Sequence, residues 1–338
     1  MPPLIYSRRQ ISTIFLEEKK MRYIGVDLHT TQITVCYLTE KSEATFKQYG
    51  LTDLDEFLSD LQREDEIAVE STGNTSWFYG QVRQRVSRVV IVNPHRFEVI
   101  KQSANKTDPH DAYNLAEYLQ MNKLPEVRPK TKSAEKVQSL VNTRLKMVRL
   151  KTGLINQIHA LSVNKGRKLK KASLNSEKGL RKVLESEWSE IERIELEIII
   201  EQIGNLKKSI QKLEVAIESE AEKLAGFENL KTISGIGSLT AGILLSVIGN
   251  IKDFAKAENL SSYFGIVPRV RKSNNTVIYG RITKRGSKIG RTTLVQSSLS
   301  AMKKNEYLKK YYEQVKARRG HGIAKIALAR KFLGIIYQ

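Results

Sequence analysis

The stretch Tyr23-Ile-Gly-Val-Asp-Leu28 is an apolar, β-branched run that carries an acid at its penultimate position. A run of this kind predicts a buried strand, and residues 32–38 repeat the pattern after the polar turn His29-Thr-Thr. The two runs therefore predict a β-hairpin. Residues 44–49 are expected to add a third strand to the same sheet.

The chain then alternates between predicted helices and strands up to residue 128. Helices are expected at 52–62, with Thr52 as the N-cap, and at 77–86, and short buried strands at 67–70 and 88–92. A further helix is predicted over 108–121, since Pro109 occupies the first helical position, where proline is tolerated. Three strands followed by alternating elements predict a mixed α/β sheet over 21–128.

Four acids occupy the ends of these elements. They are Asp27, Glu70, Asp108 and Asp111. Asp108 and Asp111 are three residues apart and share a helix face, and carboxylates gathered in this way suit hard cations such as Mg2+. Each acid also has a plainer reading, as a turn cap, an arginine partner or a helix cap. Their order resembles that of a ribonuclease-H-like (RuvC-like) metal site, and we prefer that interpretation.

The charge of the chain indicates a polyanionic partner. Lys and Arg outnumber Asp and Glu by 57 to 36 over 338 residues, for a net charge of +21. Nucleic acid is the favoured partner, and a merely soluble basic protein is the alternative. The single cysteine, Cys36, excludes an internal disulfide. No apolar run is long enough for a membrane span, and residues 1–20 lack the features of a signal peptide, so we expect them to form an N-terminal extension.

Residues 129–226 are expected to form a helical coiled-coil region. The apolar positions of its second half follow a heptad spacing, and they are Ile203, Leu206, Ile210, Leu213, Ile217, Ala221 and Leu224. A second apolar helical face runs from Val137 to Ile158. Antiparallel packing within one subunit and pairing between subunits both remain open. The intervening basic segment 165–171 is expected to be a solvated loop.

Residues 227–338 are predicted to form a mostly α-helical domain. The turn Gly235-Ile-Gly237 between two apolar helices resembles a helix-hairpin-helix turn, which can present backbone amides to a phosphate, although a plain helix connection is the alternative. No acid occurs between Asn259 and Asn305. The predicted phosphate-binding residues in this stretch are Arg269, Arg271, Lys272, Arg281, Lys284, Arg285, Lys288 and Arg291.

From residue 21 onward the chain resembles the DEDD transposases of the insertion-sequence-110 type, relatives of the Piv and MooV DNA invertases. The motifs that carry the resemblance in the first half are Ile24-Gly-Val-Asp, Glu70-Ser-Thr-Gly and Lys106-Thr-Asp-Pro-His-Asp-Ala. Those in the second half are Ile233-Ser-Gly-Ile-Gly, Tyr263-Phe-Gly-Ile-Val-Pro, Gly280-Arg-Ile-Thr-Lys-Arg-Gly and Arg291-Thr-Thr-Leu.

The resemblance implies a RuvC-like catalytic domain, a coiled-coil linker and a C-terminal transposase domain with a serine nucleophile. By position, five residues after Pro268, that nucleophile is Ser273; Asn274 and Asn275 stand where relatives carry glycine. A covalent phosphoserine would form with help from Mg2+ held by the four acids. Implied partners are the DNA of the element ends and target, a structured bridge RNA, and further copies of the chain in a dimer or tetramer. The implied location is the nucleoid-containing cytoplasm of a prokaryote.

Two other functions compete with this reading. A RuvC-like junction resolvase or nuclease would use metal-activated water and would not need the basic, serine-containing C-terminal segment. A non-enzymatic, DNA-binding remnant of a mobile element is the second alternative, and the presence of all four acids and Ser273 argues against it.

Overall fold

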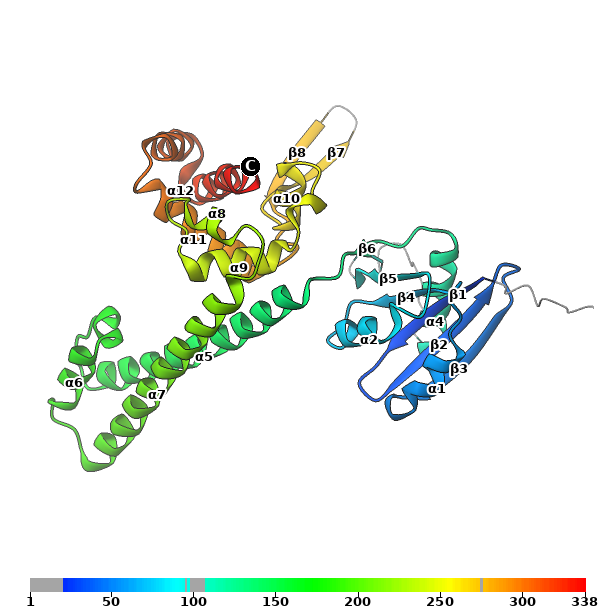
Figure 1. Cartoon of the computed structure of the whole chain (residues 1–338). Helices are drawn as coiled ribbons and strands as arrows, with labels where there is room; N and C mark the ends of the chain where they lie inside the picture. Colours follow the sequence, from blue (N-terminus) through cyan, green and yellow to red (C-terminus); the bar gives the residue numbers. More distant parts are fainter. Residues whose placement is uncertain (1–20, 95, 98–106, 274–275) are drawn as a thin grey trace, which may run out of the picture. The chain divides into compact units, whose positions relative to one another are not determined.

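The computed structural model describes residues 21–94, 96–97, 107–273 and 276–338, and it divides into two compact units (Figure 1). The first ends at Pro129 and the second begins at Lys130. The predicted extension 1–20 lies outside the described residues. The predicted boundary at residue 226, inside the second unit, stays a prediction.

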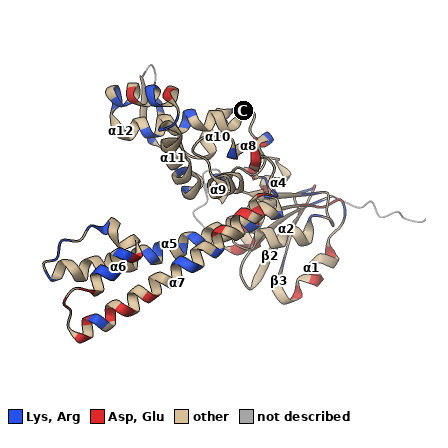
Figure 2. Cartoon of the chain, turned by 60° about the vertical axis from the view of Figure 1, so that its left-hand side comes forward, with Lys and Arg blue, Asp and Glu red and all other residues tan. Residues whose placement is uncertain are grey.

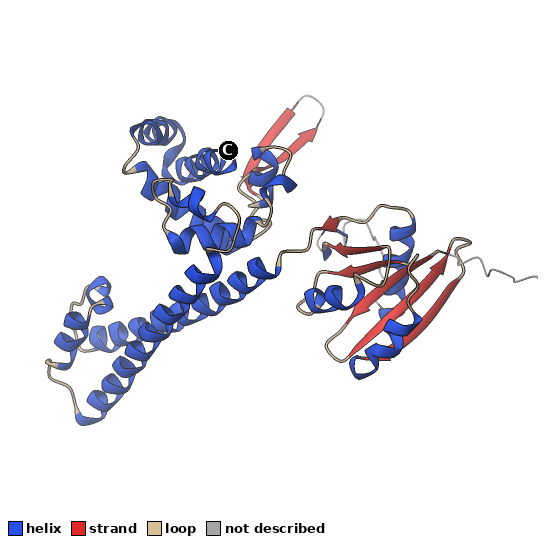
Figure 3. Cartoon of the chain, in the orientation of Figure 1, coloured by secondary structure: helices blue, strands red, loops and turns tan. Residues whose placement is uncertain are grey.

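The mixed α/β sheet expected from the sequence is present in the first unit, and it has six strands in the order β3-β2-β1-β4-β5-β6 (Figure 3). Strand β1 pairs antiparallel with β2 and parallel with β4, so it lies in the middle of the sheet. The strands are β1 (Arg22–Leu28), β2 (Gln32–Thr39), β3 (Ala44–Gly50), β4 (Glu66–Glu70), β5 (Arg88–Val92) and the unpredicted β6 (Glu126–Val127).

Helices cover both faces of this sheet. On one face α1 (Leu54–Asp60) and α2 (Thr75–Val82) bury Phe57 and Phe78 against Val26 and its neighbours. On the other face α4 (Asp108–Gln120) packs on β1, β2 and β4.

The predicted N-cap Thr52 is wrong, because residues Leu51–Asp53 form a 3-10 turn (η1) and α1 begins only after Asp53. The next helix also differs from its prediction of 77–86. Its N-cap is Asn74, and it ends at Val82.

In the second unit two long helices, α5 (Lys132–Asn164) and α7 (Glu190–Ala221), run antiparallel. Ile158 near the end of α5 shares a buried cluster with Ile199 near the start of α7. At the opposite ends, Val141 packs in the same core as Ile217. The apolar heptad positions of α7 therefore pack against α5 of the same chain.

The connection between these helices contains a short 3-10 helix, η2 (Lys171–Asn175), and α6 (Glu177–Leu184). Basic residues line the loop before α6, while acidic residues gather near the start of α7 (Figure 2). Part of the predicted solvated loop is paired instead. Lys165 lies 3.0 Å from Glu192, and the Arg167 guanidinium lies 4.1 Å from the centroid of the Trp188 ring.

The rest of the unit is helical except for one hairpin that was not predicted. The helices are α8 (Phe227–Lys231), α9 (Ser238–Ile248), η3 (Ile251–Asp253), α10 (Ala257–Tyr263), α11 (Lys288–Met302) and α12 (Glu306–Tyr337), which is kinked at Gly320. Strands β7 (Pro268–Ser273) and β8 (Thr276–Ile282) pair antiparallel, with most of their residues exposed.

Two glycine turns hold the loops next to this hairpin together. Gly265 and Gly286 both have positive φ, and a Cβ on Gly265 would lie 2.0 Å from the carbonyl oxygen of Arg285. A Cβ on Gly286 would lie 2.1 Å from the carbonyl oxygen of Tyr263. Only glycine permits this approach, so the motifs Tyr263-Phe-Gly and Lys-Arg-Gly286 interlock.

Along the described segments, each helix is too short or too polar to cross a membrane.

Candidate active site

Two of the predicted acids end neighbouring parallel strands. In the β1–β4 ladder Val26 pairs with Val69, so Asp27 and Glu70 come next to each other at the same edge of the sheet. Side chains alternate along a strand, which places Asp27 on the same face as Gly25. That face is the one covered by α4.

The other two acids reach this edge on the first turn of α4. Its N-cap is Thr107, which makes no side-chain capping bond, and Pro109 follows Asp108. Asp108 and Asp111 are both in the first turn, where the positive end of the helix dipole favours negative charge. The helix can lie this low over β1 because Gly25 has no side chain.

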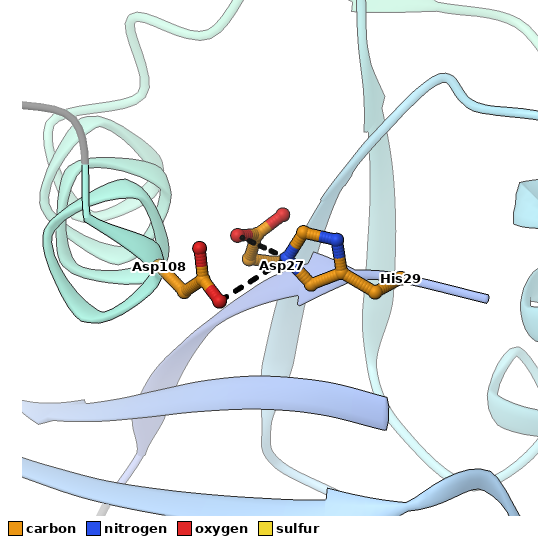
Figure 4. Close-up of side chains that lie close together, drawn as sticks. All are labelled: Asp27, His29 and Asp108. Carbon is orange, nitrogen blue, oxygen red and sulfur yellow. Dashed lines mark hydrogen bonds and ion pairs between the residues drawn. The ribbon is translucent and has the colours of Figure 1, made fainter. Parts of the chain in front are cut away.

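The structure brings Asp27 and Asp108 together around His29, a residue of the turn after β1 (Figure 4). Nε2 of His29 lies 3.1 Å from Oδ2 of Asp27 and 3.4 Å from Oδ2 of Asp108. The one sequence signal for His29 was its position two residues after Asp27, at the end of the strand.

The electrostatics of the cluster show an excess of negative charge. Burial raises the pKa of the Asp27 carboxyl, and the nearby carboxylates of Asp108 and Asp111 raise it further. The contact with His29 works in the opposite direction. A cation between these groups would relieve the repulsion.

The donor set fits a divalent metal ion. Among the described residues, ligand atoms of Asp27, His29 and Asp108 all lie within 4.8 Å of one another. Two carboxylate oxygens suit a hard cation such as Mg2+, and an imidazole nitrogen is also accepted by Mn2+ and other transition metals. Glu70 and Asp111 are not members of this close group; the register and the first turn of α4 place them at its border.

The predicted nucleophile lies in the other unit. Ser273 is the last residue of β7, it is exposed, and it pairs with Thr276 across the hairpin. Arg271 is two residues earlier on the same strand and shares its face with Ser273. Asn274 and Asn275 lie outside the described residues.

Most of the predicted phosphate-binding residues are exposed on or beside this hairpin. This holds for Arg269, Arg271, Lys272, Arg281, Lys284, Arg285 and Lys288. Arg291 differs, since it is half-buried and its Nη1 donates to the carbonyl oxygens of Phe264, Arg285 and Gly286 at 3.1–3.2 Å. Burial lowers the pKa of its guanidinium. Arg291 thus holds the interlocked loops together.

The Gly235-Ile-Gly237 turn packs inside the helical unit. A Cβ on Gly235 would lie 2.6 Å from the backbone nitrogen of Ala301 on α11. This contact gives Gly235 a packing role in a helix connection, the plainer of the two readings.

Comparison with known proteins places both units in one group. Residues 24–164 match a family model described as "Transposase", built for the DEDD transposases of IS110 type. Residues 227–313 match a second model, described as "Transposase IS116/IS110/IS902 family".

Individual relatives are similar over most of their length. The transposase for insertion sequence element IS1111A of Coxiella burnetii is 25% identical, covering 99% of this chain and 96% of the relative. The transposase for insertion sequence element IS1328 of Yersinia enterocolitica is 25% identical over 93% of this chain and 95% of its own length. The pilin gene-inverting protein of Moraxella lacunata is 26% identical over 75% and 74% respectively.

Proposed function

Because this chain belongs to the IS116/IS110/IS902 family of transposases, DNA-transposition enzymes with a DEDD N-terminal domain, we propose that it cuts and rejoins DNA strands of an insertion sequence by a metal-assisted serine mechanism. The observation that supports this most directly is the cluster of Asp27, Asp108 and His29 at the edge of the sheet. Carboxylates gathered at a partly exposed position are the expected form of a metal-assisted phosphoryl-transfer site.

The acids Asp27, Glu70, Asp108 and Asp111 would hold Mg2+. When bound, the ion would neutralise negative charge that develops on the phosphate oxygens in the transition state. The chain's own contribution is to keep two carboxylates at a fixed edge by strand register and two on a helix turn. His29 would orient the carboxylates of Asp27 and Asp108 through its contacts with them.

Ser273 would be the nucleophile. Its Oγ attacks a backbone phosphorus, the bond from phosphorus to the 3′-oxygen breaks, and the proton of the serine hydroxyl passes to that leaving oxygen. A phosphoserine and a free 3′-hydroxyl result. Attack by a 3′-hydroxyl of another strand on the phosphoserine then rejoins DNA and restores the serine. Arg271, on the same face of the hairpin, would bind a phosphate beside the serine.

The basic residues around the hairpin would bind the DNA backbone, at the element ends and at the target. These residues do not form a recognisable base-reading motif. This agrees with selection of the DNA sequence by base pairing with a bridge RNA. The acids and the serine occur in different units, and a dimer or tetramer can supply them from different copies to one site. Packing between the α5–α7 hairpins of two copies, through residues outside the buried heptad positions, would give such an assembly.

A covalent-trapping experiment tests the serine mechanism. The full chain is incubated with Mg2+ and a nicked, labelled DNA carrying an element end, and the products are separated on a denaturing gel. We expect a protein–DNA adduct that is absent with Ser273→Ala and with Asp111→Ala, although both variants still bind DNA. Recombination by Ser273→Ala would overturn the serine mechanism, and cutting without any adduct would favour hydrolysis by a RuvC-like nuclease.

A further inference from the structure

An exposed tryptophan lies on the helix that follows the strand ending at Glu70. Trp77 is on α2 and is 44% exposed, so its indole ring is open to solvent. It lines a shallow, mostly apolar hollow of about 410 Å3 together with Thr30, Leu51 and Asn74. This hollow is not part of the metal cluster, and neither the metal nor the serine mechanism uses it.

Hydrogen bonds connect the hollow to the cluster. Thr30 follows His29 directly in the chain, and Nδ2 of Asn74 donates to the carbonyl oxygen of His29 at 2.8 Å. The Thr72 hydroxyl in turn donates to Oδ1 of Asn74 at 2.9 Å. The helix that carries Trp77 is thereby fixed to the strand end that carries the histidine.

A second set of bonds fixes the same helix to Glu70. The Thr75 hydroxyl donates to the carbonyl oxygen of Glu70 at 2.6 Å, and the backbone nitrogen of Thr72 donates to the Thr75 oxygen at 2.8 Å. The loop 70–75 therefore fixes the position of α2, which carries Trp77, relative to Glu70 and His29. A group bound on the indole would have a defined position relative to a phosphate at the acids.

We propose that this hollow binds one nucleobase of the DNA strand whose phosphodiester is cut at the acid cluster, with Trp77 stacking on the base. The proposal rests on the proposed function, because it takes a phosphate at the acids as given. A base is flat and apolar on its faces, which suits an open indole and the Leu51 side chain. Stacking of this kind tolerates any base.

The polar groups of the hollow agree with binding that is independent of base identity. Both ends of the Asn74 amide already bond protein groups, namely His29 and Thr72. The other polar residue that lines the hollow is Thr30, whose side chain is small. The site would therefore fix the position of a nucleotide and leave the choice of sequence to other parts of the complex.

Fluorescence provides a direct test, because the chain has only two tryptophans. Trp188 is half-buried, and its Nε1 donates to the carbonyl oxygen of Val183 at 2.7 Å. In Trp188→Phe the emission comes from Trp77 alone. This variant is titrated, without added metal, with a short single-stranded DNA, with RNA of the same sequence, and with polyphosphate, which has no bases.

We expect saturable quenching of Trp77 by DNA and none by polyphosphate. The matched variant Trp77→Phe, in which Trp188 supplies the emission, should show little change. Quenching by polyphosphate as strong as by DNA would overturn the proposal, as would quenching by RNA alone, which would assign the hollow to the guide. No quenching by DNA that is shown to bind by gel shift would also overturn it.

A recombination assay separates this inference from the serine mechanism. Trp77→Ala should lower recombination roughly tenfold or more, while Trp77→Phe keeps a stacking ring and most of the activity. Phe46→Ala removes an exposed aromatic on β3 that does not line the hollow, and should have no effect. Full activity of Trp77→Ala, with Asp108→Asn inactive, would refute the base site alone. Quenching of Trp77 by DNA together with an active Ser273→Ala would refute the nucleophile and support the base site.

Discussion

Gly25 of β1 lies so close to Ala112 of α4 that a Cβ on Gly25 would be 1.9 Å from the Ala112 carbonyl oxygen. No side chain fits in this space. The contact sets the height of α4 over the sheet, and with it the distance of Asp108 from Asp27. The glycine of the motif Ile24-Gly-Val-Asp thus serves the site through packing.

Substituting this glycine should disrupt both fold and activity. In Gly25→Ala the new methyl group has to push α4 away from β1, which we expect to destabilise the first unit by about 1–3 kcal/mol or more and to stop recombination. Chemical denaturation measures the first effect. Gly80→Ala is the control, because a Cβ on Gly80, inside α2, meets nothing within 4 Å. Alanine at this helical position should raise the free energy of unfolding by up to about 1 kcal/mol. A Gly25→Ala protein as stable as the parent would contradict the packing argument.

The sheet was predictable because its signals are local. Alternating β-branched residues and short polar turns set β1 to β5, and the order of acids along the chain indicated where they would meet. The hairpin β7–β8 was missed for a physical reason. Its strands are mostly exposed, and β7 is rich in Arg and Lys, so they lack the buried alternation that identifies a strand from sequence.

The site was predictable in part. Strand register brings Asp27 beside Glu70, and a helix turn presents Asp108, as the spacing indicated. His29 was not recognised, since its contact with Asp108 joins residues that are far apart in the sequence. The same applies to Trp77, whose exposure depends on how α2 packs on the sheet.

Metal binding should depend on the two carboxylates that face His29. We expect Asp27→Asn and Asp108→Asn each to weaken binding of Mn2+, used as a probe for Mg2+, roughly tenfold or more. Calorimetric titration of Mn2+ into the full chain gives the affinity without any turnover. Asp55→Asn, a change to an exposed acid on α1, should leave it unchanged. Equal affinities in all three variants would show that the cluster is not the metal site.

The start of α7 should make the stability of the second unit depend on pH. The Glu192 carboxylate accepts a hydrogen bond from the Ser189 backbone nitrogen and is contacted by Lys165. These two interactions lower the pKa of the Glu192 carboxyl from 4.5 to about 2. A lowered pKa means that the charged form stabilises the fold. This contribution is complete above pH 4.5 and is lost as the pH falls toward 2.

Glu192→Gln should therefore lower the melting temperature at pH 7, with a difference from the parent that shrinks below pH 4.5. Ser189→Ala removes the other half of the same capping box and should cost about 1 kcal/mol. Glu201→Gln, a change at an exposed position of α7, provides the comparison. A melting-temperature difference for Glu192→Gln that does not change between pH 7 and pH 3 would contradict this role.

Two arginines of the basic stretch should behave in opposite ways. Arg271 is exposed on the hairpin, so Arg271→Gln should weaken DNA binding for all sequences and reduce the salt dependence of log K by about one unit, with little change in stability. Arg291 donates to the carbonyl oxygens of Phe264, Arg285 and Gly286. Arg291→Gln leaves these acceptors without their donor and should cost about 1–3 kcal/mol of stability.

Binding titrations at several salt concentrations, paired with denaturation curves, separate the two effects. If Arg291 acts by holding the interlocked loops, then the Arg291→Gln protein that remains folded keeps the parental salt dependence. A fall in salt dependence equal to that of Arg271→Gln, without loss of stability, would instead make Arg291 a phosphate contact. The two arginines contribute the same charge to the chain. They differ in their hydrogen bonds, because Arg291 donates to three backbone carbonyl oxygens and Arg271 is exposed.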